Sequence, residues 1–73
     1  MIMEKIIIKD DFIKLGQALK LTGAVESGVD AKFVILDGSV KVNGNTCYER
    51  GKKLKNNDVI SYADNDYIII SEN

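Results

Sequence analysis

The sequence contains no histidine and only one cysteine, and these absences exclude most catalytic and metal chemistry. Without histidine the chain cannot form His/Cys zinc sites or the Ser-His-Asp and Cys-His arrangements of nucleophilic enzymes. The lone Cys47 cannot form an intramolecular disulfide, a Cys-rich metal site or a C-x-x-C pair. We interpret it as a core or half-buried thiol in a protein of the reducing cytoplasm, and we expect neither metal nor cofactor.

Long apolar runs and phosphate-binding loops are also lacking. The run Ile6–Ile8 is far shorter than the apolar region of a secretory signal, and no stretch approaches the roughly 20 apolar residues of a membrane span. Neither a P-loop nor a G-x-G-x-x-G motif is present. Neighbouring carboxylates occur at Asp10/Asp11 and Asp64/Asp66, but at predicted turns or helix starts, where Asp serves the backbone. We therefore expect a non-enzymatic protein that does not contact a membrane.

The net charge is small, but the charged residues are unevenly distributed along the chain. The net charge is −1. Residues 41–55 carry five bases and one acid (+4), whereas residues 56–73 carry four acids and no base (−4). A local basic segment can bind phosphate even in a protein that is acidic on average.

The first part of the chain predicts a strand followed by a helix. Residues 4–8 are rich in β-branched isoleucine, which favours a strand. Asp10 and Asp11 then indicate the start of a helix over residues 11–22 that Gly23 ends. Two faces are predicted for this helix. The core face is Phe12, Leu15 and Leu19, and the opposite face is Lys14, Gln17 and Lys20.

A second helix is predicted after a capping box. Ser27 is expected to cap it, with Asp30 three residues later. The helix should run to Leu36 and end at Gly38 in the left-handed conformation. Its core face is predicted from the i, i+4, i+7 spacing of Val29, Phe33 and Leu36.

Four short strands are predicted in the second half. Val40 and Val42 alternate with polar residues, and Asn43-Gly44 is a tight-turn signal leading into a strand with Thr46 and Tyr48. Leu54 should enter the core. A turn at 56–58 precedes a strand over 59–62, and a turn at 64–66 precedes a strand over 67–70. The prediction is a single α+β domain, residues 1–73, with two helices packed against a small, mostly antiparallel sheet in the order β-α-α-β-β-β-β.

Two ordered sets of residues resemble a known family. They are Leu15-Gly16-Gln17-Ala18-Leu19-Lys20-Leu21 with Gly23, Ser27-Gly28 and Ala31-Lys32, and then Gly38-Ser39-Val40-Lys41-Val42-Asn43-Gly44 with Arg50-Gly51-Lys52-Lys53-Leu54 and Asp58-Val59-Ile60. Over residues 11–62 this order resembles the alpha-L RNA-binding motif family, typified by ribosomal small-subunit protein four. It looks closest to the small stand-alone bacterial branch, the YaaA/YbcJ-like proteins. The resemblance implies a helix pair that presents one side to RNA.

The chain departs from this pattern at three places. Glu49 replaces one base of the branch's Arg-Arg-Gly-Arg-Lys segment, and Asn57 stands where a glycine is usual. The second helix opens with residues 28–30 rather than with the arginines common in the wider family. These departures predict modest affinity or a narrower choice of partner.

Basic and capping residues are the candidate RNA contacts. Phosphates are bound by Lys, Arg, hydroxyl groups and helix N-termini. The candidates are Lys14, Lys20, Ser27, Lys32, Lys41, Arg50, Lys52 and Lys53. Simpler readings stay open, in which Ser27 only caps its helix and the lysines and Arg50 only form solvated faces. Tyr48, Tyr62 and Tyr67 are interpreted as sheet residues, which favours structured RNA recognised by shape over splayed bases.

The leading hypothesis is therefore binding of structured RNA, such as ribosomal RNA or ribosomal particles, in a bacterial cell. The alternative is a protein-interaction module in which the acidic residues between 58 and 72 meet a basic partner such as a ribosomal protein. A β-grasp carrier of the sulfur-transfer type is a third idea, but such carriers end in Gly-Gly and this chain ends Ser71-Glu72-Asn73. No oligomer is implied.

Overall fold

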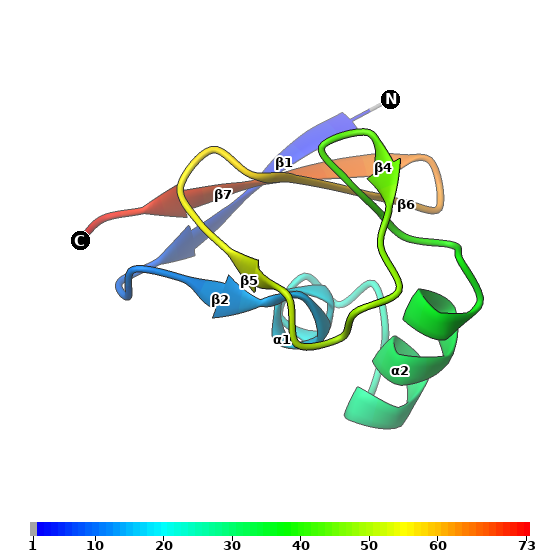
Figure 1. Cartoon of the computed structure of the whole chain (residues 1–73). Coiled ribbons are helices and arrows are strands. Elements are labelled where there is room, and N and C mark those ends of the chain that lie inside the picture. Colours follow the sequence, from blue (N-terminus) through cyan, green and yellow to red (C-terminus); the bar gives the residue numbers. More distant parts are fainter. Residues whose placement is uncertain (1) are drawn as a thin grey trace.

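A computed structural model describes residues 2–73 and shows a five-stranded sheet with two helices on one face (Figure 1). The elements in chain order are β1 (Ile2–Ile8), β2 (Ile13–Lys14), α1 (Leu15–Leu21), α2 (Gly28–Leu36), β3 (Lys41–Val42), β4 (Asn45–Thr46), β5 (Lys53–Leu54), β6 (Val59–Tyr62) and β7 (Asn65–Ser71). The predicted α+β class is confirmed. No helix within residues 2–73 is long and apolar enough to cross a membrane.

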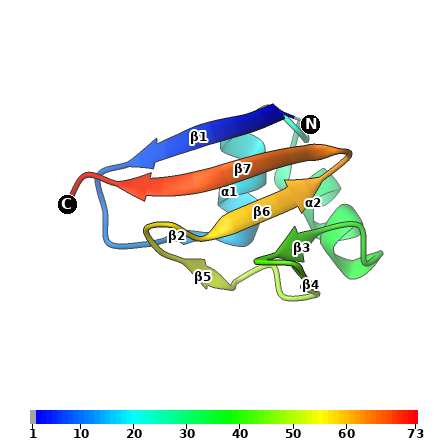
Figure 2. The ribbon, with the colours of Figure 1, turned by 90° about the horizontal axis from the view of Figure 1, so that it is seen from above.

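The main sheet has the strand order β1-β7-β6-β3-β4, visible from above in Figure 2. All of its pairs are antiparallel except β1 with β7, which run parallel from Ile2 opposite Asn65 to Ile8 opposite Ser71. The first and last strands of the chain are thus neighbours, and the predicted mostly antiparallel sheet is observed. The helices lie behind this sheet in the same view.

The structure contains a second, two-stranded sheet, and because of it the first helix begins later than predicted. Residues 13 and 14 form β2 and pair antiparallel with β5, so α1 begins only at Leu15, and Asp10 and Asp11 do not cap it. Ile13 and Leu54 lie opposite each other and are both buried. The burial of these two side chains across a strand pair replaces the first helical turn, which local spacing alone had favoured.

The core face of α1 is as predicted except at Phe12. Leu15 and Leu19 are fully buried, whereas Phe12 precedes the helix and is 39% exposed. The ring of Phe12 instead lies beneath the Lys53 ammonium, 4.8 Å from Nζ to the ring centroid. Gly23 adopts a φ of +78° just after the helix, as predicted.

The bounds of α2 are predicted correctly, but its core face is wrong. Ser27 caps the helix and Gly38 follows it at φ +83°. The buried residues are Ala31 and Ile35. The predicted core residues are exposed by 61%, 64% and 57% for Val29, Phe33 and Leu36. Both sides of this helix are apolar, so periodicity could not choose between them. Packing of α2 against α1 chose the side with the small Ala31.

The β3–β4 hairpin turns at Asn43 and Gly44, with φ values of +52° and +85°, as predicted. The strand after the turn ends at Thr46, so the placement of Tyr48 in a strand is wrong. Tyr48 lies in the following loop, is 61% exposed, and its ring packs beside Gly38. The Arg50 and Lys52 carbonyls accept from the first amides of α1, and the Lys52 N–H donates to the Glu49 carbonyl, so the loop after Cys47 leaves the sheet.

The last strand begins two residues earlier than predicted. The turn between β6 and β7 is formed by Ala63 and Asp64, both at positive φ, and Asn65 already belongs to β7. Asn57 at φ +75° serves the preceding turn, as its glycine-like role predicted. Tyr67 is buried and Tyr62 half-buried in the sheet, which confirms their predicted packing role.

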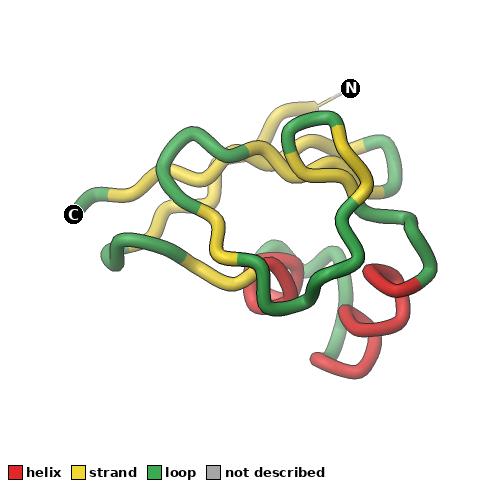
Figure 3. The backbone as a smooth tube through the Cα atoms, in the orientation of Figure 1, coloured by secondary structure: helices red, strands yellow, loops and turns green. Residues whose placement is uncertain are grey.

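Figure 3 shows how the helices and the two sheets surround one region. The buried apolar side chains form one core cluster drawn from all of these elements. Its fully buried large side chains are Leu15, Leu19, Ile35, Val40, Leu54, Ile60 and Ile69. Every layer contributes at least one of these side chains. The backbone that carries Lys14 and Lys53 is therefore held by the neighbouring core residues Leu15 and Leu54.

Candidate nucleic-acid interface

A shallow groove of about 430 Å³ lies where three separate segments of the chain meet. It is lined by Lys14, Gly16, Gln17, Lys20, Gly28, Ala31, Arg50 and Gly51. We call this the basic groove, because its lining holds three bases and, among the residues described, no acid. Exposed cationic side chains around a concave surface with small glycine walls allow a polyanion to approach closely.

The loop that supplies Arg50 is docked on the first turn of α1. The backbone N–H of Leu15 donates to the Lys52 carbonyl at 2.9 Å, and the N–H of Gly16 donates to the Arg50 carbonyl at 3.1 Å. The first amides of a helix have no partner within the helix, and here the loop carbonyls satisfy two of them. These amides are thus not free to bind phosphate, but they fix the loop beside the groove.

The start of α2 forms the opposite wall. Ser27 Oγ accepts a hydrogen bond from the backbone N–H of Asp30 at 3.2 Å, so its capping role is established. Gly28 lines the basic groove and has open space beside its Cα. The helix dipole places partial positive charge at this end, although Asp30 in the first turn offsets part of it.

Lys14 and Lys53 lie directly opposite each other on β2 and β5. Both side chains are exposed, while their neighbours Ile13 and Leu54 point into the core. Like charges in opposite positions repel each other, and a bound anion would relieve that repulsion. The Lys53 ammonium lies over the ring of Phe12, which lines a separate hollow that shares Lys14 and Gln17 with the groove.

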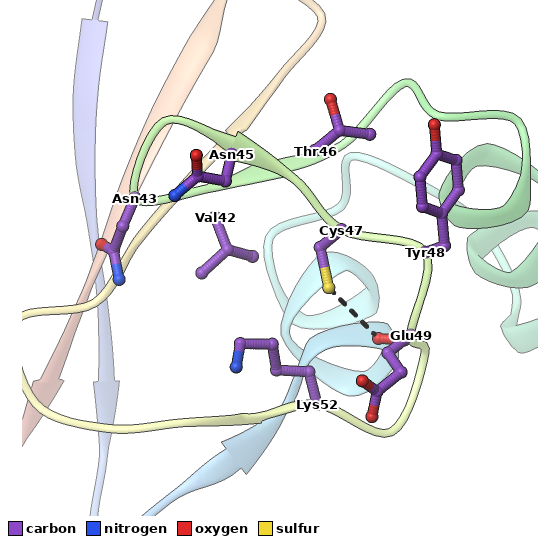
Figure 4. Close-up of a pocket in the computed structure, with 8 residues that line it drawn as sticks. All are labelled: Val42, Asn43, Asn45, Thr46, Cys47, Tyr48, Glu49 and Lys52. Atoms are coloured by element: carbon purple, nitrogen blue, oxygen red, sulfur yellow. Dashed lines mark hydrogen bonds between the residues drawn. The ribbon is translucent and has the colours of Figure 1, made fainter.

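Lys52 and Lys32 lie outside the groove lining. Lys52 lines a neighbouring hollow beneath the β3–β4 hairpin, together with Cys47 and Glu49 (Figure 4). The Cys47 thiol is half-buried and free, and it donates to the Glu49 carbonyl at 3.7 Å. Lys32 is exposed on α2, one helical turn after Gly28.

Lys41 is not brought to the groove. It is exposed on β3 in the main sheet, where it lines a different hollow with Ser61, Asp64 and Asp66. Its surroundings are therefore acidic, in contrast to those of Lys14, Lys20 and Arg50. The chain distance between 41 and 50 had suggested one basic surface, but the intervening hairpin separates the two.

The carboxylates form no metal centre in the part of the chain that the structure describes, residues 2–73. The Asp10 carbonyl accepts from Ser71 Oγ at 2.8 Å, and the Asp11 side chain bonds that of Asn73. Asp66 accepts from Ser61 Oγ at 2.7 Å. Asp10, through its backbone, and Asp11, through its side chain, thus bond the C-terminal end of the chain, while Asp66 links β7 to β6.

Gly16 is the groove residue that sequence reasoning missed. It is buried in α1, and its backbone contacts Arg50. The available signal was a glycine inside a predicted helix, where it destabilises relative to alanine unless a close approach requires it. Gln17 was placed on the correct helix face, and it lines the groove between Lys14 and Lys20 in sequence.

Comparison with protein families agrees with this geometry. A sequence model described as S4 domain matches residues 6–70, nearly the whole chain. No curated protein gives a significant match. The match confirms the resemblance drawn from the two ordered motif sets, since the alpha-L motif and the S4 domain are one family, which in general binds RNA without catalysis. The chain belongs to the S4 domain family and carries that family's RNA-binding fold.

Proposed function

We propose that this protein binds structured RNA, with ribosomal RNA as the leading target, and that it does so without catalysing a reaction. The basic groove would hold the phosphate backbone through Lys14, Lys20 and Arg50. Lys53, Lys52 and Lys32 would extend the contact on either side, and Ser27 would contribute through the helix that it caps.

The observation that carries this proposal is the convergence in the basic groove. Lys14, Lys20 and Arg50 come from the end of β2, the last turn of α1 and the 49–52 loop. A solvated charged surface does not need such an arrangement, in which one base is anchored by backbone hydrogen bonds beside two others. Ordered cations around a concave wall are suited to a polyanion of fixed shape.

The proposed mode is recognition of backbone and shape. The exposed aromatic residues, Phe12, Phe33 and Tyr48, do not line the groove, and the other two tyrosines are at least half-buried. Stacking on splayed bases is therefore not available inside the groove, whereas phosphate contacts are. Binding would then depend strongly on salt concentration.

The test is a titration of a fluorescent ribosomal RNA fragment at several salt concentrations. The groove variant replaces Lys14, Lys20 and Arg50 with Ala. A matched control replaces the exposed Lys5, Lys9 and Lys55, which removes the same charge elsewhere. We expect the groove variant to lose binding and the control to retain most of it. Equal losses would mean that only net charge matters, and the groove would be rejected.

The cellular setting follows the same proposal. The resemblance to the small stand-alone bacterial branch supports a bacterial cytoplasmic protein that associates with ribosomal particles. Sedimentation of the native protein through a sucrose gradient with purified ribosomal subunits would test this. Co-migration that salt disrupts and the groove variant lacks is expected; free protein at the top of the gradient at low salt would remove ribosomal RNA as the target.

The alternative, a protein partner at the acidic end, has weaker support. Asp58 accepts hydrogen bonds from Asn43 Nδ2 at 3.1 Å and from the Lys55 amide at 2.7 Å. Asp66 is similarly bonded to Ser61. Two of the four acids in this segment are thus occupied within the fold, which favours the RNA proposal.

A further inference from the structure

Within residues 2–73, Gly16 is the glycine with the least space for a side chain, and the residue that occupies this space is Arg50. A Cβ atom built on Gly16 would lie 2.7 Å from Cγ of Arg50 and 3.4 Å from its Cδ. The first of these distances is far inside van der Waals contact. The aliphatic stem of Arg50 therefore lies directly across the backbone of α1, in the space that any other residue at position 16 would fill.

The glycine serves the side chain of Arg50 and not the backbone of its loop. The same Cβ atom would lie 3.6 Å from the Arg50 carbonyl oxygen, which is an ordinary contact. An alanine at position 16 is thus compatible with the hydrogen bond from its N–H to that carbonyl. It is incompatible only with the path that the Arg50 side chain takes.

Displacement of Cγ has a large consequence for the guanidinium group. Cγ is the first atom beyond Cβ, so while the hydrogen bond from Gly16 holds the Arg50 backbone, Cγ can move away only by rotation about the Cα–Cβ bond. That rotation carries Cδ and the whole guanidinium to another staggered position. Arg50 lines the groove together with Lys14, Lys20 and Gly28, so this rotation would move its charged end relative to them.

We propose that Gly16 is a positioning residue for RNA binding, which acts by holding the Arg50 guanidinium over the basic groove. This inference rests on the proposed function, since it assigns Arg50 to phosphate contact. An arginine that is held in place can bind a phosphate with two parallel hydrogen bonds and loses less side-chain freedom on binding. Gly16 itself need not touch the RNA.

A double-mutant cycle tests the proposal with Gly16→Ala, Arg50→Ala and the combined variant. Alanine at position 50 has no Cγ, so the steric conflict with position 16 disappears in the combined protein. We expect Arg50→Ala and Gly16→Ala each to weaken RNA binding on the order of fivefold. Each should also lower the slope of log affinity against log salt by roughly 0.7–0.9. The combined variant should bind as Arg50→Ala does.

Three results would overturn the inference, and they separate it from the proposed function. Wild-type affinity in Gly16→Ala with weakened Arg50→Ala rejects the positioning role and leaves the groove intact. Losses that add in the combined variant reject coupling between the two residues. Wild-type affinity in Arg50→Ala removes Arg50 from the interface, which refutes this inference and that part of the proposed function together.

Thermal unfolding distinguishes positioning from a purely structural effect. We expect the combined variant to melt no lower than Arg50→Ala, because alanine is a better helix former than glycine once the conflict is gone.

A direct measurement of the contact between Gly16 and Arg50 requires no variant. In the wild-type protein, nuclear Overhauser effects should connect the Gly16 α-protons with the Arg50 γ-protons. Their absence in an otherwise assigned spectrum would refute the proposed contact even if Gly16→Ala proved unable to fold.

Discussion

Asn43 and Val59 are joined by two hydrogen bonds across neighbouring strands. The Asn43 backbone N–H donates to the Val59 carbonyl at 2.8 Å, and the Val59 N–H donates to Asn43 Oδ1 at 2.9 Å. The side-chain amide also donates to Asp58 at 3.1 Å. The hairpin residue therefore does more than turn the chain: it fastens the β3–β4 hairpin to the start of β6.

Replacement of Asn43 should destabilise the fold by two separable effects. Asn43→Ala loses the side-chain hydrogen bonds and places a Cβ-bearing residue without a polar side chain at φ +52°. We expect a loss of about 1–3 kcal/mol in the free energy of unfolding. Asn43→Gly, the matched control, loses only the hydrogen bonds and should cost less. Urea titration of both variants measures this, and equal costs would mean that the positive φ carries no penalty here.

The two apolar sides of α2 should respond very differently to truncation. Ile35→Ala empties a fully buried position and should cost about 2–5 kcal/mol. Phe33→Ala changes a side chain that is 64% exposed, and it should cost less than about 1 kcal/mol. Chemical denaturation compares the two variants directly. A larger cost at Phe33 would restore the face predicted from periodicity and contradict the observed orientation of the helix.

Substitutions in the turn between β6 and β7 should stabilise the protein. Ala63 and Asp64 both adopt positive φ, at +53° and +66°, where Asn and Gly are preferred. The double substitution Ala63→Asn with Asp64→Gly should stabilise the protein by about 0.5–2 kcal/mol, since it relieves both residues. Ala63→Val is the opposing control and should destabilise. A melting temperature that fell in the first variant would show that this turn is held by interactions beyond its backbone.

The salt dependence of RNA affinity should report each phosphate contact made by a single base of the basic groove. Lys14→Ala removes one proposed phosphate contact and should lower the log–log salt slope of RNA binding by roughly 0.7–0.9. Lys5→Ala, on β1 at the far edge of the sheet, is the matched control and should leave the slope unchanged. Fluorescence anisotropy over a range of salt concentrations gives both slopes. If the two slopes fall together, the RNA contacts a far larger surface than the groove.

The sequence by itself determined the parts of this fold that depend on neighbouring residues. The N-cap at Ser27, the turn at Asn43 and Gly44, and the glycine-like role of Asn57 were all predicted correctly. Each involves a side chain and a backbone within a few residues, so the local chemistry is sufficient. The order of motifs also identified the family, because the motifs are spread over residues 11–62, which is most of the chain.

Only the tertiary structure decided the relations between distant segments. The pairing of Ile13 with Leu54 converted a predicted helical turn into a strand. Packing against α1 selected Ile35 over Phe33 on a helix that is apolar on both sides. The packing of these distant segments also brought Arg50 against Gly16 and left Lys41 on the main sheet. A linear pattern of charges cannot contain this information, because which cations share a surface depends on how strands and helices far apart in sequence pack around one core.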